Sequence, residues 1–130
     1  MDTEDLPHLV IRACMQVHAT LGPGLTREAY KECLAVELRD LELPVERDRP
    51  LSFDYRGHHI TCAAQLDFVV DEALILRVLA VDEVGPMERP AMETWLRLSG
   101  LRTGLIVNFQ VPVMRKGIQK MTLKRREAEP

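Results

Sequence analysis

Apolar residues recur at spacings of three and four along two stretches near the N-terminus, and this periodicity predicts two amphipathic helices. The first helix covers residues 6–21 and ends at the breaker Gly22-Pro23-Gly24. The second begins near Thr26, whose hydroxyl can accept a hydrogen bond from a free helix amide, and it ends before Pro44. The chain therefore begins with two helices joined by a glycine-rich connection.

Short apolar or alternating stretches after Pro44 predict a series of strands. Arg56-Gly57 and Asp71-Glu72 are tight turns between neighbouring strands. The expected strands are residues 45–49, 51–55, 58–62, 65–70, 74–81 and 104–109, with an irregular strand or hairpin over 111–123.

The strand over residues 74–81 is almost continuously apolar, which is typical of a central strand. A helix over residues 91–98, with Gly100 as its left-handed cap, follows it and crosses over to the strand 104–109. The crossover implies that these two strands pair in parallel. This order of elements predicts an α/β fold in which helices cover a mixed sheet.

The composition is that of one folded domain, with 46% hydrophobic and 28% charged residues in a chain of 130. We expect a single domain over residues 1–126 and a short tail over residues 127–130. The net charge of −3 excludes a global positive field that would attract nucleic acid or an anionic membrane. Three cysteines without a C-x-x-C pair suit a reducing compartment. Neither a signal peptide nor a membrane span is indicated, so we expect a cytoplasmic protein.

Asp67 is a carboxylate inside a predicted strand, where burial is costly unless it has a partner. It is either a salt-bridged structural residue or a metal ligand. Metal-dependent phosphodiester cleavage needs oxygen ligands for the ion and a lysine near the attacking water.

Several blocks of sequence occur in the order and spacing of a known family. They are Val17-His18, Leu21-Gly22-Pro23-Gly24-Leu25, Tyr30, Leu66-Asp67-Phe68-Val69-Val70, Ala80-Val81, the segment from Trp95 to Arg102, and the segment from Gly104 to Phe109. With these blocks the chain resembles the GxxExxY proteins of the PD-(D/E)XK nuclease-like superfamily. The resemblance covers most of the chain and implies a restriction-endonuclease-like αβββαβ core.

The chain departs from that family at the positions where the resemblance implies a metal site. Arg27 stands where the family name has its glutamate, and Arg77 and Leu79 stand where the nuclease pattern has Glu-x-Lys. Gln16 replaces a glutamate before Val17, and Ala91 replaces a glutamine. Of the implied site only Asp67 remains.

Two arginines in place of acids put fixed positive charge where magnesium would bind, and Leu79 can neither stabilise nor deprotonate a reacting group. We therefore expect a degenerate site without catalysis, without a metal and without a cofactor. If Arg27 and Arg77 both approach Asp67, their guanidinium groups can replace the ion.

The leading hypothesis is a catalytically inactive nuclease-fold protein that acts by binding or by self-assembly, as a homo-oligomer or filament scaffold. Strand edges such as residues 45–55 could pair between copies. Binding to a phosphate backbone is the other form of this hypothesis, since a C-terminal run of basic residues contains no acid. These residues are Arg115, Lys116, Lys120, Lys124, Arg125 and Arg126.

The alternative is a divergent nuclease that depends on Mg²⁺ or Mn²⁺ and uses Asp67 with a relocated acid. The candidates for that acid are Glu28, Glu72, Asp82 and Glu83. Other chemistry is not indicated: His18 is expected to be a structural histidine, His58 and His59 face opposite ways on a solvated strand, and the cysteines are expected in the core.

Overall fold

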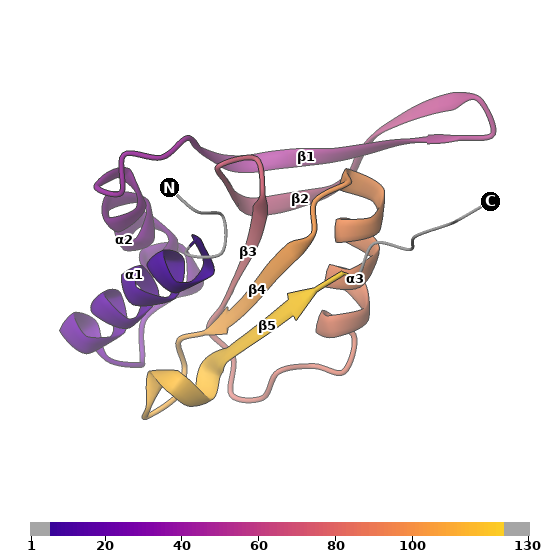
Figure 1. Ribbon diagram of the computed structural model, residues 1–130. Coiled ribbons are helices and arrows are strands. Elements are labelled where there is room, and N and C mark those ends of the chain that lie inside the picture. Colours follow the sequence, from indigo (N-terminus) through magenta and orange to yellow (C-terminus); the bar gives the residue numbers. More distant parts are fainter. Residues whose placement is uncertain (1–5, 124–130) are drawn as a thin grey trace.

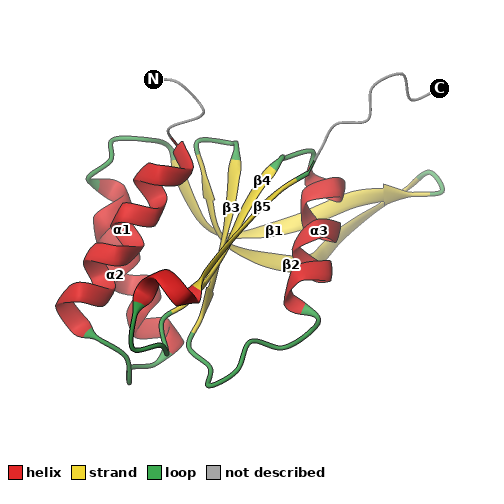
Figure 2. Ribbon diagram, turned by 60° about the horizontal axis from the view of Figure 1, so that its bottom comes forward, coloured by secondary structure: helices red, strands yellow, loops and turns green. Residues whose placement is uncertain are grey.

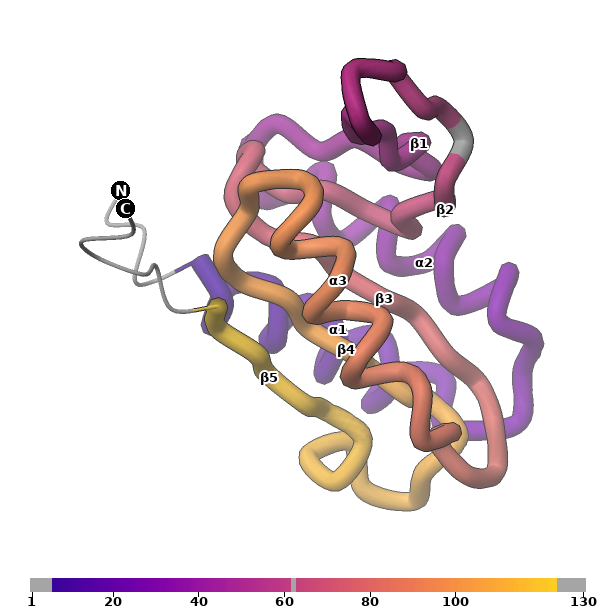
Figure 3. Tube along the Cα trace, turned by 90° about the vertical axis from the view of Figure 1, so that its right-hand side faces the viewer, coloured from indigo at the N-terminus to yellow at the C-terminus, as the bar shows by residue number. Residues whose placement is uncertain are grey.

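The computed structural model describes residues 6–123, apart from the side chain of Cys62, as three layers. Two helices, α1 (Leu6–Leu21) and α2 (Arg27–Arg39), cover one face of a five-stranded sheet. A third helix, α3 (Glu88–Ser99), covers the other face (Figure 2). In Figure 3, α3 lies in front of β3 and β4, and α1 and α2 lie behind them.

The sheet is mixed, and its strands lie side by side in the order in which they occur in the sequence (Figure 1). Neighbouring strands are antiparallel except β3 and β4, which are parallel because α3 crosses over between them. The order from α2 to β4 is the expected αβββαβ core. The strands are β1 (Val45–Tyr55), β2 (His58–Val70), β3 (Leu74–Leu79), β4 (Thr103–Asn108) and β5 (Ile118–Thr122), with a 3₁₀ helix η2 (Met114–Gly117) before β5.

The sequence pattern predicted the helices well. The first helix has the predicted bounds, and the hydroxyl of Thr26 accepts a hydrogen bond from the amide of Ala29 at the start of α2. Gly100 has a φ of 82° and ends α3 as predicted. Helix α3 begins at Glu88 rather than at residue 91, because Pro90 lies in the first helical turn, where no amide hydrogen is required.

The strand bounds were predicted less well, since four expected short strands form two long ones. Residues 45–49 and 51–55 form the single strand β1, and residues 58–62 and 65–70 form β2. Pro50 does not interrupt β1, where it pairs with Gln65, because β1 is an edge strand and a proline can turn its amide-free side outward. The strand β3 ends at Leu79, two residues earlier than expected.

The hydrophobic core has two parts, one on each face of the sheet, and β3 contributes to both. Leu76 and Val78 pack with the residues of α1 and α2, whereas Ile75 and Leu79 pack under α3. Alternating side chains of one strand are thus buried on opposite faces, which confirms the prediction of a central strand. Cys14 belongs to the first part, where burial raises the pKa of its thiol to about 12.

Gly117 is expected to be the glycine least tolerant of substitution. A Cβ at this position would overlap with the backbone carbonyl oxygen of Asn108, and backbone cannot move aside as a flexible side chain does. We expect Gly117→Ala to lower the free energy of unfolding by about 2–3 kcal/mol, as for other overpacked sites. Urea denaturation of the variant measures this loss.

Gly85→Ala is the matched control, because nothing lies within 4 Å of the added methyl group. This variant should unfold at the wild-type urea concentration. Equal stability of the two variants would show that the backbone around Gly117 adapts at no cost.

Candidate functional site

The candidate site lies where β2 and β3 part. These strands pair over only three residue pairs, from Val70 and Leu74 to Phe68 and Leu76. Beyond Phe68 the next residue of β2 is Asp67, whose Oδ2 accepts a hydrogen bond of 2.8 Å from the backbone amide of Val78. The carboxylate thus occupies the opening of the sheet, and its side chain is only 3% exposed.

Three cationic side chains surround this carboxylate. Arg27, the first residue of α2, donates from Nη2 to Oδ1 of Asp67 and from Nε to the carbonyl of Val78, the latter at 2.9 Å. The Nζ of Lys31 lies 3.5 Å from the same Oδ1. Arg77, on β3, donates from Nη1 to Oδ2 at 3.5 Å. A buried anion is therefore paired on both of its oxygens.

Two further carboxylates complete the charge balance. Asp48, on β1, accepts a hydrogen bond of 2.6 Å from Lys31, which is itself buried. Its neighbours on β1 pair with the neighbours of Asp67 on β2, so the two acids lie opposite each other with Lys31 between them. Glu88, at the start of α3, accepts a hydrogen bond of 3.2 Å from Arg77. We call Asp67, Arg27, Lys31, Arg77, Asp48 and Glu88 the charge cluster.

Local backbone and packing hold these side chains in place. Asp48 has a φ of 55°, in the left-handed region that aspartate tolerates better than most residues. The guanidinium carbon of Arg77 lies 5.7 Å from the ring centroid of Trp95, a cation–π distance. Burial lowers the pKa of Arg77, but the hydrogen bond and attraction of Glu88 and the charge of Asp67 outweigh this and raise it overall. Arg77 is consequently a permanent cation.

Arg27 and Arg77 both contact Asp67, which is the condition under which the sequence allowed guanidinium groups to replace the ion. The other three residues at which the sequence departs from the family pattern form no ion pair with the charge cluster. Leu79 is buried in the apolar layer under α3. Gln16 is exposed on α1, where its amide donates to Thr20, and Ala91 is half-buried on α3.

Sequence reasoning missed Lys31, Asp48 and Glu88. A signal for Lys31 was present, because a residue four positions after Arg27 lies on the same face of a helix. That face continues with the buried Leu34 and Leu38, so Lys31 had to be buried or paired. No pattern within β1 or α3 indicated that Asp48 and Glu88 would meet these cations, since both contacts join distant parts of the chain.

The resemblance seen in the sequence implies a divalent metal at this position, and the residues present do not fit one. Both oxygens of Asp67 already accept from cations or from the amide of Val78. A metal ion there would face three positively charged side chains at short range. Among residues 6–123, Cys62 aside, no three His, Cys, Asp or Glu side chains are grouped closely enough to hold a metal ion.

The acids considered as relocated ligands are all exposed. Glu28 pairs with Arg27 at 3.3 Å, and Glu72 pairs with Arg49 at 2.8 Å on the β2–β3 turn. Asp82 and Glu83 lie in the loop after β3. Glu28, like Asp48 and Glu88, is linked to Asp67 only through a shared cation, in its case Arg27.

Acid should weaken the charge cluster through Asp48. The hydrogen bond from Lys31 holds the pKa of Asp48 below its ordinary value of 3.8. As the pH falls towards that value and below it, the unfolded chain takes up a proton that the folded chain still excludes, so the folded state loses stability. The urea concentration at the midpoint of unfolding should therefore fall from about pH 5 downward, and it should fall less steeply with pH in Asp48→Asn than in the wild type. Equal slopes for wild type, Asp48→Asn and the exposed control Asp82→Asn would contradict this expectation.

Residues considered for other roles lie elsewhere. Arg115 and Lys116 are exposed on η2 and Lys120 is exposed on β5, whereas Lys124, Arg125 and Arg126 lie outside the described residues. His18 is buried, and its Nε2 is hydrogen-bonded to the carbonyl of Val111 at 2.8 Å, as expected of a structural histidine.

Comparison with known proteins adds the family. No curated protein and no solved structure gave a match to this sequence. None of the helices within residues 6–123 combines the length and the apolar character that crossing a bilayer requires. A family model described as the PD-(D/E)XK nuclease superfamily matches residues 4–121, and the fold described above agrees with it. The chain belongs to the PD-(D/E)XK nuclease superfamily.

Proposed function

We propose that this protein is a non-catalytic member of the superfamily, of the GxxExxY type, that acts by binding or by self-association. The observation that carries the proposal is the pairing of Asp67 with Arg27, Lys31 and Arg77. In this arrangement side-chain cations take the place that a catalytic metal would need. The charge cluster then stabilises the fold instead of supporting chemistry.

The missing lysine supports the same conclusion. Leu79 stands where the nuclease pattern has the lysine of Glu-x-Lys, and it is packed in the apolar layer under α3. An aliphatic side chain can neither orient a water molecule nor neutralise developing charge. Asp67 alone supplies none of these functions, because both of its oxygens are occupied.

A cleavage assay tests the proposal. Purified protein is incubated with duplex and single-stranded DNA and RNA in Mg²⁺ or Mn²⁺, and we expect the substrates to remain intact. Cleavage that EDTA abolishes and that Asp67→Asn reduces would overturn the proposal, because Asp67 is the metal ligand of the alternative and a contaminating nuclease would be indifferent to the substitution. The divergent nuclease with a relocated acid would then be the correct function.

Self-association is the mode of action that a specific feature favours. The hairpin of β1 and β2 extends beyond the body of the sheet (Figure 1). Within this extension, Phe53 pairs with Ile60 and Tyr55 pairs with His58. Directly paired side chains share one face, and alternate residues of a strand do as well, so these four side chains lie together. We call residues 53–60 the arm.

The arm is amphipathic, because its other face carries the hydrogen-bonded pair Asp54 and His59. On the apolar face, Tyr55 is 60% exposed and Ile60 is 38% exposed. A two-stranded ribbon is marginally stable in water unless something covers its apolar face. Three of its four side chains are apolar and the fourth is the imidazole of His58, so it is matched by another largely apolar face, such as the arm of a second copy.

Sedimentation velocity over a concentration series tests self-association. We expect species larger than a monomer in the wild type, and a shift towards monomer in Tyr55→Ser/Ile60→Ser. Val36→Ser is the control, because Val36 is 52% exposed on α2, away from the arm. A monomer at every wild-type concentration would exclude this mode of action.

The same experiment with labelled nucleic acid tests phosphate binding. Arg115 and Lys116 are adjacent and exposed, so they can contact a phosphate backbone without base readout. Comigration at low salt that is lost at high salt and in Arg115→Gln/Lys116→Gln would support this role. Binding that ignores both salt and the substitution would contradict it.

A further inference from the structure

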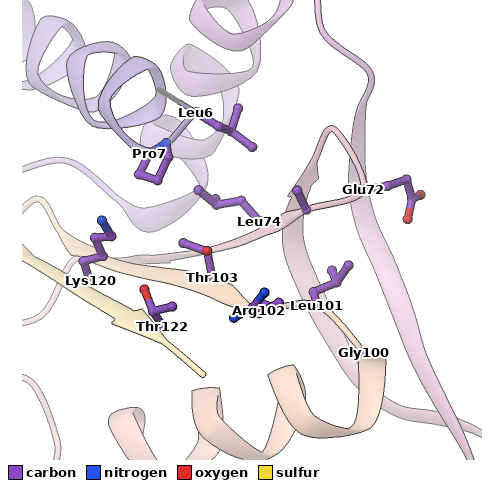
Figure 4. A pocket seen from close by; sticks show the side chains of 11 residues that line it. Leu6, Pro7, Glu72, Leu74, Gly100, Leu101, Arg102, Thr103, Lys120 and Thr122 are labelled. Atoms are coloured by element: carbon purple, nitrogen blue, oxygen red, sulfur yellow. The ribbon is translucent and has the colours of Figure 1, made fainter. Parts of the chain in front are cut away.

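A second site lies at the other end of the strands, away from the charge cluster. A cavity of about 640 Å³ opens between the first turn of α1, the β2–β3 turn and the turn after α3 (Figure 4). This volume is in the range of pockets that hold small molecules. Its lining combines apolar side chains with the polar residues Glu72, Arg102, Thr103, Lys120 and Thr122.

The floor of the cavity is a row across three strands. Leu74 of β3 is in register with Thr103 of β4, which is in register with Thr122 of β5. Lys120 pairs with Leu105, a core residue on the face that α1 and α2 cover, and Thr122 lies two residues further along the same strand. The two threonines and the lysine therefore project from the same face of the sheet. Two hydroxyls and an ammonium thus share one side of the cavity.

The charge in the cavity is positive. Glu72 is held by Arg49, which donates to both of its carboxylate oxygens at 2.8 and 2.9 Å. Arg102 and Lys120 form no ion pair with any other residue in the described range 6–123. Guanidinium, ammonium and hydroxyl groups are the donors that proteins use for phosphate.

The remaining wall is apolar. Leu6 and Pro7 lie above the floor from α1, and Leu101 lies at the turn before β4 (Figure 4). An inorganic ion would leave this wall uncovered, whereas an apolar group beside the phosphate would cover it. We propose that the cavity binds a small organic phosphate monoester, with its phosphate at Arg102, Lys120 and the threonines and its apolar part against Leu6 and Pro7.

This site is independent of the proposed function. Leu74 on its floor and Val78 at Asp67 are four residues apart on β3, about 13 Å along a strand. None of the lining residues contributes to the charge cluster. A failure to bind phosphate esters would therefore not change the expectation that nucleic acid stays intact. Cleavage of nucleic acid, in turn, would not exclude phosphate binding in the cavity.

Isothermal titration calorimetry with phenyl phosphate tests the proposal on the full chain. We expect saturable binding, weakened about tenfold by Arg102→Gln and about tenfold by Lys120→Gln, since each removes a charge-assisted hydrogen bond. Arg97→Gln is the matched control, because Arg97 is exposed on α3 outside the cavity, and its dissociation constant should equal that of the wild type. Both substituted residues are exposed, so the variants should fold normally.

Two ligand controls sharpen the outcome. Phenol should bind much more weakly than phenyl phosphate, because it lacks the group that the cations recognise. Inorganic phosphate that binds as tightly as phenyl phosphate would overturn the ligand class, since the apolar wall would then contribute nothing. Absence of saturable binding at millimolar phenyl phosphate, or equal dissociation constants in wild type, Arg102→Gln and Lys120→Gln, would overturn the site.

Discussion

Asp67→Ala is expected to lower the free energy of unfolding by about 3 kcal/mol, because it leaves a group of cations without their shared anion. Lys31 is the most buried of them, at 8% side-chain exposure, and would keep Asp48 as its partner. Arg27 and Arg77 are 31% and 25% exposed and can recover part of their hydration. The loss should therefore fall at the low end of the range for broken buried ion pairs, about 3–5 kcal/mol.

Urea denaturation measures this loss, with Asp54→Ala as the matched control. Asp54 is also a strand aspartate, but its side chain is 77% exposed and its partner is a single exposed histidine. We expect the control to unfold at nearly the wild-type urea concentration. If Asp67→Ala were as stable as the control, the cations would not depend on Asp67, and a structural role for the charge cluster would be wrong.

The second large effect is a stability that depends on metal, created by Arg27→Glu/Arg77→Glu. These two arginines contact opposite oxygens of Asp67, so the double substitution surrounds one carboxylate with two more. In EDTA the variant should be much less stable than the wild type, because like charges are placed close together in a partly buried site. A divalent cation relieves that repulsion.

Thermal unfolding with and without Mn²⁺ measures this effect. A ligand that binds only the folded state, at 100 times its dissociation constant, stabilises it by about 2.7 kcal/mol. We expect a shift of that order in the double variant and none in the wild type. Arg27→Gln/Arg77→Gln is the control, because it removes the same cations without adding acids and should not respond to Mn²⁺.

The result also bears on function. Stabilisation of the wild type by Mn²⁺ would mean that a metal displaces the arginines, and the proposal of a non-catalytic protein would then be untenable. Failure of the double variant to respond, when it is folded, would mean that these positions do not correspond to a metal site. Cleavage activity is not expected from the double variant, since Leu79, proposed above to stand at the lysine position, is unchanged.

Features that depend on local periodicity could be predicted from the sequence. The bounds of α1, the cap at Thr26, the left-handed Gly100 and the parallel pairing of β3 with β4 follow from residue spacing, side-chain chemistry or a short crossover. The approach of Arg27 and Arg77 to Asp67 was considered as a condition for replacing the metal ion. That condition came from motif positions, because nothing in the spacing of these residues brings a helix start and two strands together.

Features that depend on pairing between distant segments could not be predicted in the same way. Whether residues 45–49 and 51–55 form one strand depends on β2, which supplies hydrogen-bond partners on both sides of Pro50. The fourfold pairing of Asp67, with the amide of Val78 as one donor, exists only because β2 and β3 part after Phe68.

The sequence by itself thus determined the helices and the order of helices and strands, since these depend on neighbours within one or two turns of the chain. Only the tertiary structure decided how the charges are balanced, which face of the arm is apolar and that Arg102, Lys120 and the two threonines line one cavity. The physical reason is that charge pairing and burial act through space. A side chain such as Lys31 therefore acquires its role from segments far from it along the chain.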